Sequence, residues 1–119
     1  MYYYDIENHS ADDIIAGFSF SPIVIAAFAG EKIVGIIRGR KEKIINLFVD
    51  GHYHKQGIGR QLVSKFELSA RQQETKFIKI NASLYAVNFY QKLGYKKTTG
   101  VRFGKGLKFQ AMKKTFVLG

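Results

Sequence analysis

The chain has 119 residues, a length typical of one compact domain, and its hydrophobic fraction (46%) and charged fraction (24%) are those of an ordinary globular protein. It contains no cysteine, which excludes a disulfide framework, a thiolate metal site and a cysteine nucleophile. Nineteen Lys and Arg against nine Asp and Glu give a formal net charge of +10, which favours anionic partners without specifying one.

The start of the chain shows no targeting signal. The first residues lack the basic start and apolar run of a secretory signal, and the longest apolar run, residues 23–29, is far shorter than the about 20 residues that span a bilayer. We therefore expect a cytoplasmic protein with no membrane partner. Ser10, followed by Asp12 and Asp13, predicts the capped first turn of a short helix that ends near Gly17.

Three strand-like segments follow. Residues 23–29 and 32–38 are rich in β-branched side chains and are joined by Gly30 and Glu31, which predicts a hairpin. Residues 43–49 predict a third strand, and Asp50 with Gly51 marks its end.

The pattern then changes to that of a helix. Ile58, Leu62 and Phe66 recur every four residues among polar side chains, which predicts an amphipathic helix from residue 58 onward. Residues 77–81 return to the alternation of a strand.

A second helix and a closing hairpin complete the chain. Ser83 is expected to cap the helix, and Gly94 stands where helices commonly end. Residues 95–115 hold two short strand-like runs separated by glycines. The order of elements predicts the mixed α/β (α+β) class with a largely antiparallel sheet, in a single domain over residues 1–119.

The clearest local feature is the segment from His54 to Arg60, His-Lys-Gln-Gly-Ile-Gly-Arg, between a predicted strand and a predicted helix. Its glycines let the backbone approach a ligand, and the first amides of a helix point outward without internal partners. Such a turn can hold a pyrophosphate or can simply link strand to helix. The third glycine of the dinucleotide-binding fingerprint is missing.

A second segment about 25 residues later runs from Asn81 to Tyr95, Asn-Ala-Ser-Leu-Tyr-Ala-Val-Asn-Phe-Tyr-Gln-Lys-Leu-Gly-Tyr. Together the two segments resemble the signature of the GNAT (GCN5-related N-acetyltransferase) family. The first family pattern is Arg/Gln-x-x-Gly-x-Gly/Ala, here with His54 in its leading position, and the second is Ala-x-x-x-Tyr-x-x-x-Gly-Phe/Tyr. The resemblance runs from about Ile23 to Met112 and is to small, single-domain, bacterial-type members.

The resemblance implies a GNAT-like mixed, largely antiparallel central sheet flanked by helices. The family has a strand and two helices before the hairpin, so residues 1–21 would form an abbreviated N-terminal part. The implied activity is an N-acetyltransferase (an acyltransferase) that moves acetyl directly from acetyl-CoA to a primary amine of a small-molecule or protein acceptor. No metal is implied, and the histidines at positions 9, 52 and 54 form no convincing ligand set.

The resemblance also implies roles for single residues. The backbone N–H of Val49 would stabilise negative charge on the thioester oxygen, and Tyr90 would give a proton to the departing thiolate. The coenzyme would be bound by Phe48, Val49, His54, Lys55, Gln56, Gly57, Ile58, Gly59, Arg60, Asn81, Ser83, Asn88 and Tyr90. From their positions alone, Phe48, Val49 and Tyr90 could equally be core side chains, Ser83 a helix cap and Lys55 a solvated residue.

The general base is left open. No acidic residue falls on the third strand, and Asn46 on that strand cannot act as a base. Glu42, His52 and His54 are the candidates for direct or water-mediated proton removal.

Two other functions remain in view. A catalytically weak GNAT-like protein could bind acyl-CoA or a partner protein. A nucleic-acid-binding module would fit the net charge and the cluster Arg38, Arg40, Lys41 and Lys43, but no nucleic-acid-binding motif is present, so nucleic acid is not among the expected partners. The apolar C-terminal hairpin is compatible with a homodimer.

Overall fold

The computed structural model describes residues 1–6 and 22–116. The chain divides into two compact units, Met1–Thr75 (unit 1) and Lys76–Gly119 (unit 2), and each unit is described by itself. The helix predicted near residues 10–17 lies outside the described residues.

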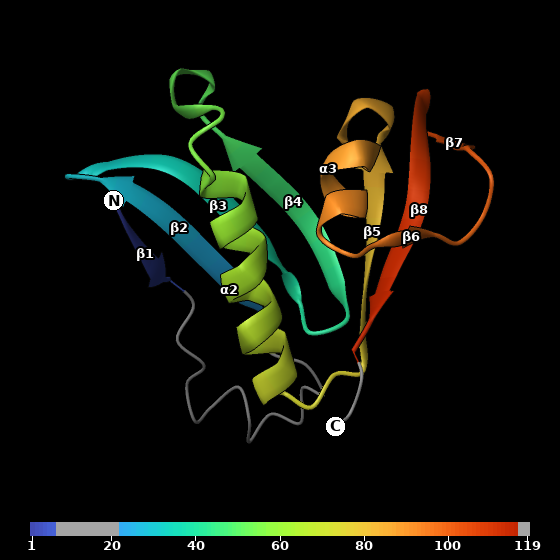
Figure 1. The fold of residues 1–119 in the computed structure, drawn as a ribbon, viewed down its shortest axis with the longest axis horizontal. Coiled ribbons are helices and arrows are strands. Elements are labelled where there is room, and N and C mark those ends of the chain that lie inside the picture. The colour runs from blue at the N-terminus through green and yellow to red at the C-terminus, as the bar shows by residue number, and fades with distance from the viewer. Residues whose placement is uncertain (7–21, 117–119) are drawn as a thin grey trace. The chain divides into compact units, whose positions relative to one another are not determined.

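Unit 1 is built on four antiparallel strands in chain order (Figure 1). They are β1 (Tyr2–Asp5), β2 (Ile23–Ala29), β3 (Lys32–Arg40) and β4 (Lys43–Val49). The predicted hairpin and third strand are confirmed, and β3 continues two residues beyond its predicted end.

Strand β1 has no counterpart among the elements that the sequence predicts. It pairs with β2 along its whole length, and the rings of Tyr2 and Phe28, which lie opposite each other, stack with centroids 5.2 Å apart. Cross-strand aromatic pairs of this kind stabilise a short strand that propensity alone would not. Part of the N-terminal structure that the GNAT resemblance places before the hairpin is therefore present.

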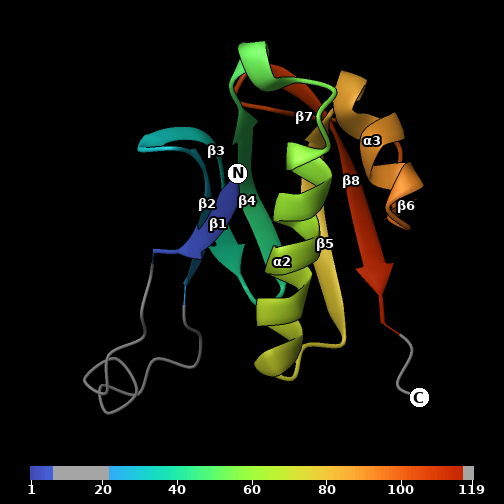
Figure 2. The same ribbon diagram turned by 60° about the vertical axis from the view of Figure 1, so that its left-hand side comes forward.

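Helix α2 (Ile58–Gln72) supplies the core of unit 1 (Figure 2). Its buried stripe, predicted from the period of its apolar residues, contains Ile58, Leu62, Val63, Phe66 and Ala70. The helix contacts β2 and β3 most extensively. Thus the predicted amphipathic helix is confirmed and packs on the centre of the four-stranded sheet.

A glycine on β3 allows the first turn of α2 to approach closely. A Cβ added at Gly35 would lie 3.1 Å from Ile58 Cγ2 and 3.1 Å from Leu62 Cδ1. Gly35 pairs with Val49, the last residue of β4. The contact therefore fixes the start of α2 against the same part of the sheet at which β4 ends.

Unit 2 is built around its last strand. This strand, β8, pairs antiparallel with β5, β6 and β7, and a short helical segment follows β5. The elements are β5 (Phe77–Ser83), the 3-10 turn η2 (Leu84–Ala86), α3 (Val87–Lys92), β6 (Lys96–Lys97), β7 (Arg102–Gly104) and β8 (Leu107–Thr115). The predicted strand, helix and closing hairpin are confirmed, and the mixed, largely antiparallel fold class with them.

Strand β5 has one buried and one open face. Ile78 and Ile80 are 0% and 5% exposed, whereas Lys79 and Asn81, on the opposite face of the strand, are exposed.

Among the helices in the described part of the chain, none has the length and apolar character needed to span a bilayer.

The register between β3 and β4 shifts after Arg38, and Gly39 lies at this irregularity. A Cβ at Gly39 would fall within the contact distance of the Lys43 backbone carbonyl, which cannot move without breaking the pairing of the two strands. We expect Gly39→Ala to lower the free energy of unfolding by about 2–3 kcal/mol in a denaturant titration. Gly100→Ala is the matched control, since a Cβ there meets no atom within 4 Å. Equal stability of the two variants would contradict this packing.

Candidate functional site

The candidate site begins where β4 ends. Val49 pairs with Gly35, and the next residue, Asp50, donates its N–H to the carbonyl of Val34 at 2.8 Å. Asp50 and Val34 each neighbour one member of the pair Val49–Gly35. In an antiparallel ladder, a hydrogen bond from Asp50 to Val34 means that Val49 and Gly35 form no hydrogen bond with each other. The N–H and C=O groups of Val49 therefore both point away from β3.

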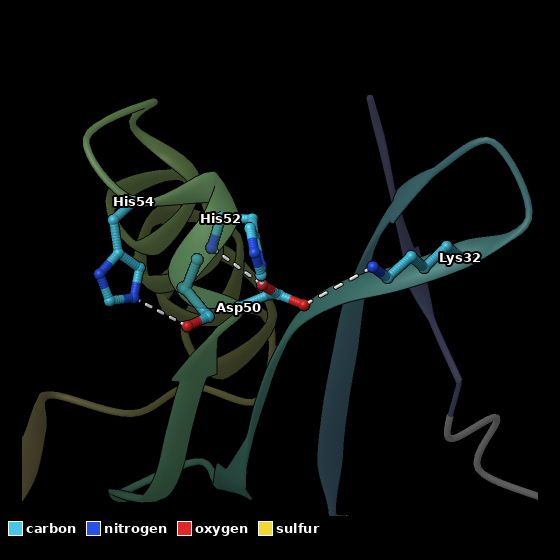
Figure 3. Close-up of polar contacts among 5 residues, drawn as sticks. Lys32, Asp50, His52 and His54 are labelled. Atoms are coloured by element: carbon cyan, nitrogen blue, oxygen red, sulfur yellow. Dashed lines mark hydrogen bonds and ion pairs between the residues drawn. The ribbon is translucent and has the colours of Figure 1, made fainter.

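The imidazole of His54 binds the carbonyl of Val49. Nε2 of His54 lies 2.9 Å from this oxygen (Figure 3), and because a carbonyl only accepts hydrogen bonds, Nε2 is the donor. The bond ties the turn after β4 to the end of the strand. In the neutral ring Nδ1 is then an acceptor, and it donates a hydrogen bond to an anion only when the ring is protonated.

Asp50 organises the short 3-10 turn η1 (Gly51–Tyr53) that follows β4. Its Oδ1 accepts hydrogen bonds from the backbone N–H of His52 at 2.9 Å and from His52 Nδ1 at 3.1 Å, and its Oδ2 lies 3.8 Å from Lys32 Nζ (Figure 3). These contacts, above all the backbone hydrogen bond, lower the pKa of the Asp50 carboxyl below its usual value. An ionised Asp50 favours the His52 tautomer that is protonated at Nδ1, with Nε2 as its basic nitrogen.

Left-handed backbone conformations connect this turn to α2. Lys55 has φ 63°, and Gly57, the N-cap of α2, has φ 79°. The carbonyl of Gly57 accepts the first helical hydrogen bond from Gln61, at 3.0 Å, and no side chain caps the helix. The N–H groups of residues 58–60 therefore have no acceptor within the helix and form a cluster of donors at its positive end.

The side chains predicted to flank this turn are mostly open to solvent. Lys55, Gln56 and Arg60 are exposed. Phe48 is 62% exposed, so the interpretation of its side chain as core is wrong, because it lies on the open face of β4. Val49 is half-buried.

The three candidate bases lie at different ends of β4. Glu42 precedes the strand, whereas His52 and His54 follow it. A strand of this length separates its ends by about 20 Å, so Glu42 is far from Val49. Asn46 accepts a hydrogen bond from Arg38 Nε at 2.9 Å.

In unit 2 the predicted site residues lie on several surfaces. Asn81 and Ser83 share the open face of β5, away from its buried side chains. Ser83 precedes η2 but makes no capping hydrogen bond, so the predicted cap interaction is not formed. On α3, Asn88 is exposed and Tyr90 is buried, as expected for positions about 200° apart around a helix.

Tyr90 is enclosed by aromatic neighbours. It is 4% exposed, and its ring makes edge contacts with Phe89 and Tyr95, with centroids 5.0 and 5.5 Å apart. Burial raises the pKa of Tyr90 to about 12. Its hydroxyl therefore keeps its proton throughout the neutral range.

The sequence pattern indicates His52 only as a possible base, and it singles out neither Asp50 nor Lys32 as a site residue. Asp50 and Gly51 mark a turn in the sequence, but the side-chain contacts of Asp50 depend on the conformation of that turn. Among the described residues there is no group of three or more His, Asp or Glu side chains that could hold a metal ion.

Comparison with known proteins gives the family. The family model of the acetyltransferase (GNAT) domain matches residues 8–116. A search of curated protein sequences gave no significant match. Because the family model covers most of the chain, the chain belongs to the GNAT acetyltransferase family, a family of N-acetyltransferases.

Solved structures share the fold at low sequence identity. A GCN5-related N-acetyltransferase from Rhodopseudomonas palustris is 21% identical with a TM-score of 0.74, over 88% of this chain and 66% of that one. An aminoglycoside 6'-N-acetyltransferase solved with coenzyme A is 17% identical with a TM-score of 0.75, over 100% and 99%. The PaiA N-acetyltransferase from Thermoplasma acidophilum, solved with coenzyme A, is 20% identical with a TM-score of 0.65, over 80% and 61%. The chain thus spans slightly less than two thirds of the first and third of these structures.

The raised pKa of Tyr90 predicts how stability depends on alkaline pH. The folded state favours the neutral hydroxyl, so this stabilisation is complete below about pH 10, the ordinary tyrosine value, and is lost as the pH rises to about 12. At pH 11 the loss is about 1 kcal/mol. In thermal melts, wild type should therefore lose more stability between pH 9 and pH 11 than Tyr90→Phe does. Tyr85→Phe, at a position 93% exposed, should follow wild type. Parallel curves for wild type and Tyr90→Phe would contradict the burial of this hydroxyl.

Proposed function

We propose that the protein transfers an acetyl group directly from acetyl-CoA to a primary amine, and that residues 1–119 act as one acetyltransferase domain. The observation that carries this proposal is the match of one GNAT family model to residues 8–116, across both units. The connection from β4 to α2 supports it, because its outward amides are a donor set of the kind that binds phosphates.

In this proposal the turn from His54 to Arg60 holds the pyrophosphate of acetyl-CoA. The amides of residues 58–60 are the main donors, and the exposed side chains of Lys55, Gln56 and Arg60 add polar contacts. The main contact of His54 is with the protein itself, through the hydrogen bond of its Nε2 to the Val49 carbonyl. Binding by backbone donors is thus compatible with histidine in place of the family's Arg or Gln.

The backbone N–H of Val49 is proposed to stabilise negative charge on the thioester oxygen. This N–H points away from β3. The position of Val49 is fixed by the pairing of β4 with β3 and by the hydrogen bond from His54 to the Val49 carbonyl. A donor held in advance needs no reorganisation during reaction. The exposed ring of Phe48 would lie along the pantetheine arm.

Unit 2 is proposed to supply Tyr90 as the acid that protonates the departing thiolate. With its pKa raised to about 12, the hydroxyl is protonated at neutral pH, as a proton donor must be. Asn81, Ser83 and Asn88 are proposed to hydrogen-bond the pantetheine amides or the ribose phosphate.

We propose His52 as the base that takes the proton of the attacking amine. The Nδ1 of His52 is hydrogen-bonded to Asp50, so Nε2 is the nitrogen that can accept a proton, directly or through water. The acceptor, the homodimer and the cytoplasmic location expected from the sequence stay predictions.

The cofactor assignment is tested by calorimetric titration with acetyl-CoA. Gly57→Leu places a side chain at φ 79° beside the donor amides, and we expect at least a tenfold loss of affinity. Gly30→Leu is the matched control: it imposes the same backbone strain at φ 62°, in the β2–β3 turn, and should bind as wild type does. Equal binding by both variants would place the coenzyme elsewhere. Binding without thiol release over a panel of amines would favour the alternative of a catalytically weak acyl-CoA-binding protein.

The base is tested by the pH profile of kcat. His52→Gln should lower kcat about 100-fold at pH 7 and recover as the pH approaches the pKa of the acceptor amine, because a neutral amine needs no base. Glu42→Gln, at the other end of β4, should keep the wild-type profile. A loss that is the same at every pH would rule His52 out as the base.

A further inference from the structure

The charge of the chain is divided unevenly between the two units. The whole chain has nineteen Lys and Arg and nine Asp and Glu. Residues 76–119 contain ten of these basic residues and none of the acidic ones, which leaves nine of each in residues 1–75. Unit 2 therefore carries the entire formal charge of +10, and unit 1 is formally neutral.

The proposed coenzyme site does not account for this distribution. The turn and helix amides proposed to hold the pyrophosphate belong to unit 1, where basic and acidic residues balance. The unit 2 residues proposed to contact the coenzyme, Asn81, Ser83, Asn88 and Tyr90, are uncharged. The excess charge of unit 2 is therefore available to another anionic partner.

Three lysines form a row across unit 2. Lys113 on β8 lies directly opposite Lys79 of β5 on one side and directly opposite Lys96 of β6 on the other. Residues that face each other across strands point to the same face of a sheet, with strands about 4.8 Å apart. Like charges in such positions destabilise a sheet, so this row has a cost for folding that binding an anion would offset.

The face that carries the row is open. On β5 the residues of this face alternate with the buried Ile78 and Ile80, and Lys79 is exposed. The ring of Phe77 lies between two of the lysines, with its centroid 5.3 Å from Lys79 Nζ and 5.5 Å from Lys113 Nζ. Such cation–π contacts orient both ammonium groups over the same surface.

Basic and aromatic side chains continue toward one end of unit 2. Arg102 of β7 lies opposite Phe109 of β8, on the face of Lys113. Phe109 also lies opposite Ser83, so η2 and β7 flank the same end of β8 (Figures 1 and 2). The ring of Tyr85 in η2, at this end, is 93% exposed. The exposed ring of Phe103 lies opposite Lys108 and therefore points to the other face of the sheet, away from Lys113.

We propose that this surface of unit 2 binds single-stranded nucleic acid, with Lys79, Lys96 and Lys113 on the phosphates and Tyr85 as a stacking surface for a base. Lysine contacts with phosphates provide most of the sequence-independent affinity for nucleic acids, whereas lysine is depleted at protein–protein interfaces. Exposed aromatic rings beside a basic surface are typical of single-strand binding, since every base offers a face for stacking. The proposal goes beyond acetyl transfer and does not rest on it.

The test is the fluorescence anisotropy of labelled oligothymidylate and oligouridylate of about 16 nucleotides, titrated with the protein at about 50 to 200 mM salt. Wild type should bind, with an affinity that falls steeply as salt increases. The triple variant Lys79→Gln, Lys96→Gln and Lys113→Gln should lose about tenfold or more in affinity, and its salt slope should fall by about 2, as expected for three lost phosphate contacts on a single strand.

The matched control removes the same charge from unit 1, by Lys41→Gln, Lys43→Gln and Lys65→Gln, and should change the affinity less than about twofold. Tyr85→Ala should weaken single-strand binding and leave duplex binding unchanged.

Four results would overturn the proposal. The first is no binding by wild type, the second is an equal loss of affinity in the two triple variants, and the third is duplex bound as tightly as single strands. The fourth is displacement of the labelled oligonucleotide by polyglutamate as effectively as by unlabelled oligonucleotide, which would indicate an acidic protein partner.

Discussion

The contact of the first turn of α2 with Gly35 fixes the geometry on which the candidate site depends. Because Gly35 has no side chain, Ile58 and Leu62 can pack directly on β3 beside the end of β4. The amides that open α2 are thereby held on the same framework as the N–H of Val49. Asp50 and His54 then fix the connection between them, one by capping η1 and the other by binding the Val49 carbonyl.

The two units have different electrostatic characters that suit different tasks. Unit 1 binds anions, in our proposal, through backbone donors and a helix terminus, which need no net charge. Unit 2 carries a large unbalanced positive charge on side chains, which acts at longer range and is weakened by salt. In our proposals, the coenzyme pyrophosphate is held by the backbone donors of unit 1 and the polyanion by the lysine side chains of unit 2.

The elements that the sequence predicts well are those whose pattern depends on local chemistry. The apolar period of Ile58, Leu62 and Phe66 and the β-branched runs around Gly30 correspond to α2 and to the β2–β3 hairpin. Strand β1 escaped prediction because it depends on pairing with β2, including the stacking of Tyr2 on Phe28.

The same limit on prediction from local sequence applies to the residues of the candidate site. The spacing of Gly57 and Gly59 indicates a ligand-binding turn, and the residues around Tyr90 match the second GNAT pattern. The bond from His54 to Val49, the contacts of Asp50 and the row of Lys79, Lys96 and Lys113 depend on strand register and turn conformation. No local pattern in the sequence encodes such contacts between residues brought together by folding.

Backbone hydrogen exchange with and without acetyl-CoA tests the central claim, that the start of α2 holds the coenzyme. If the coenzyme lies there, exchange should slow at the amides of Ile58, Gly59 and Arg60 and at Val49, with little change in the β3–β4 turn at the other end of β4. Saturating acetyl-CoA that leaves these amides unprotected, or protects only residues of unit 2, would contradict the assignment of the site.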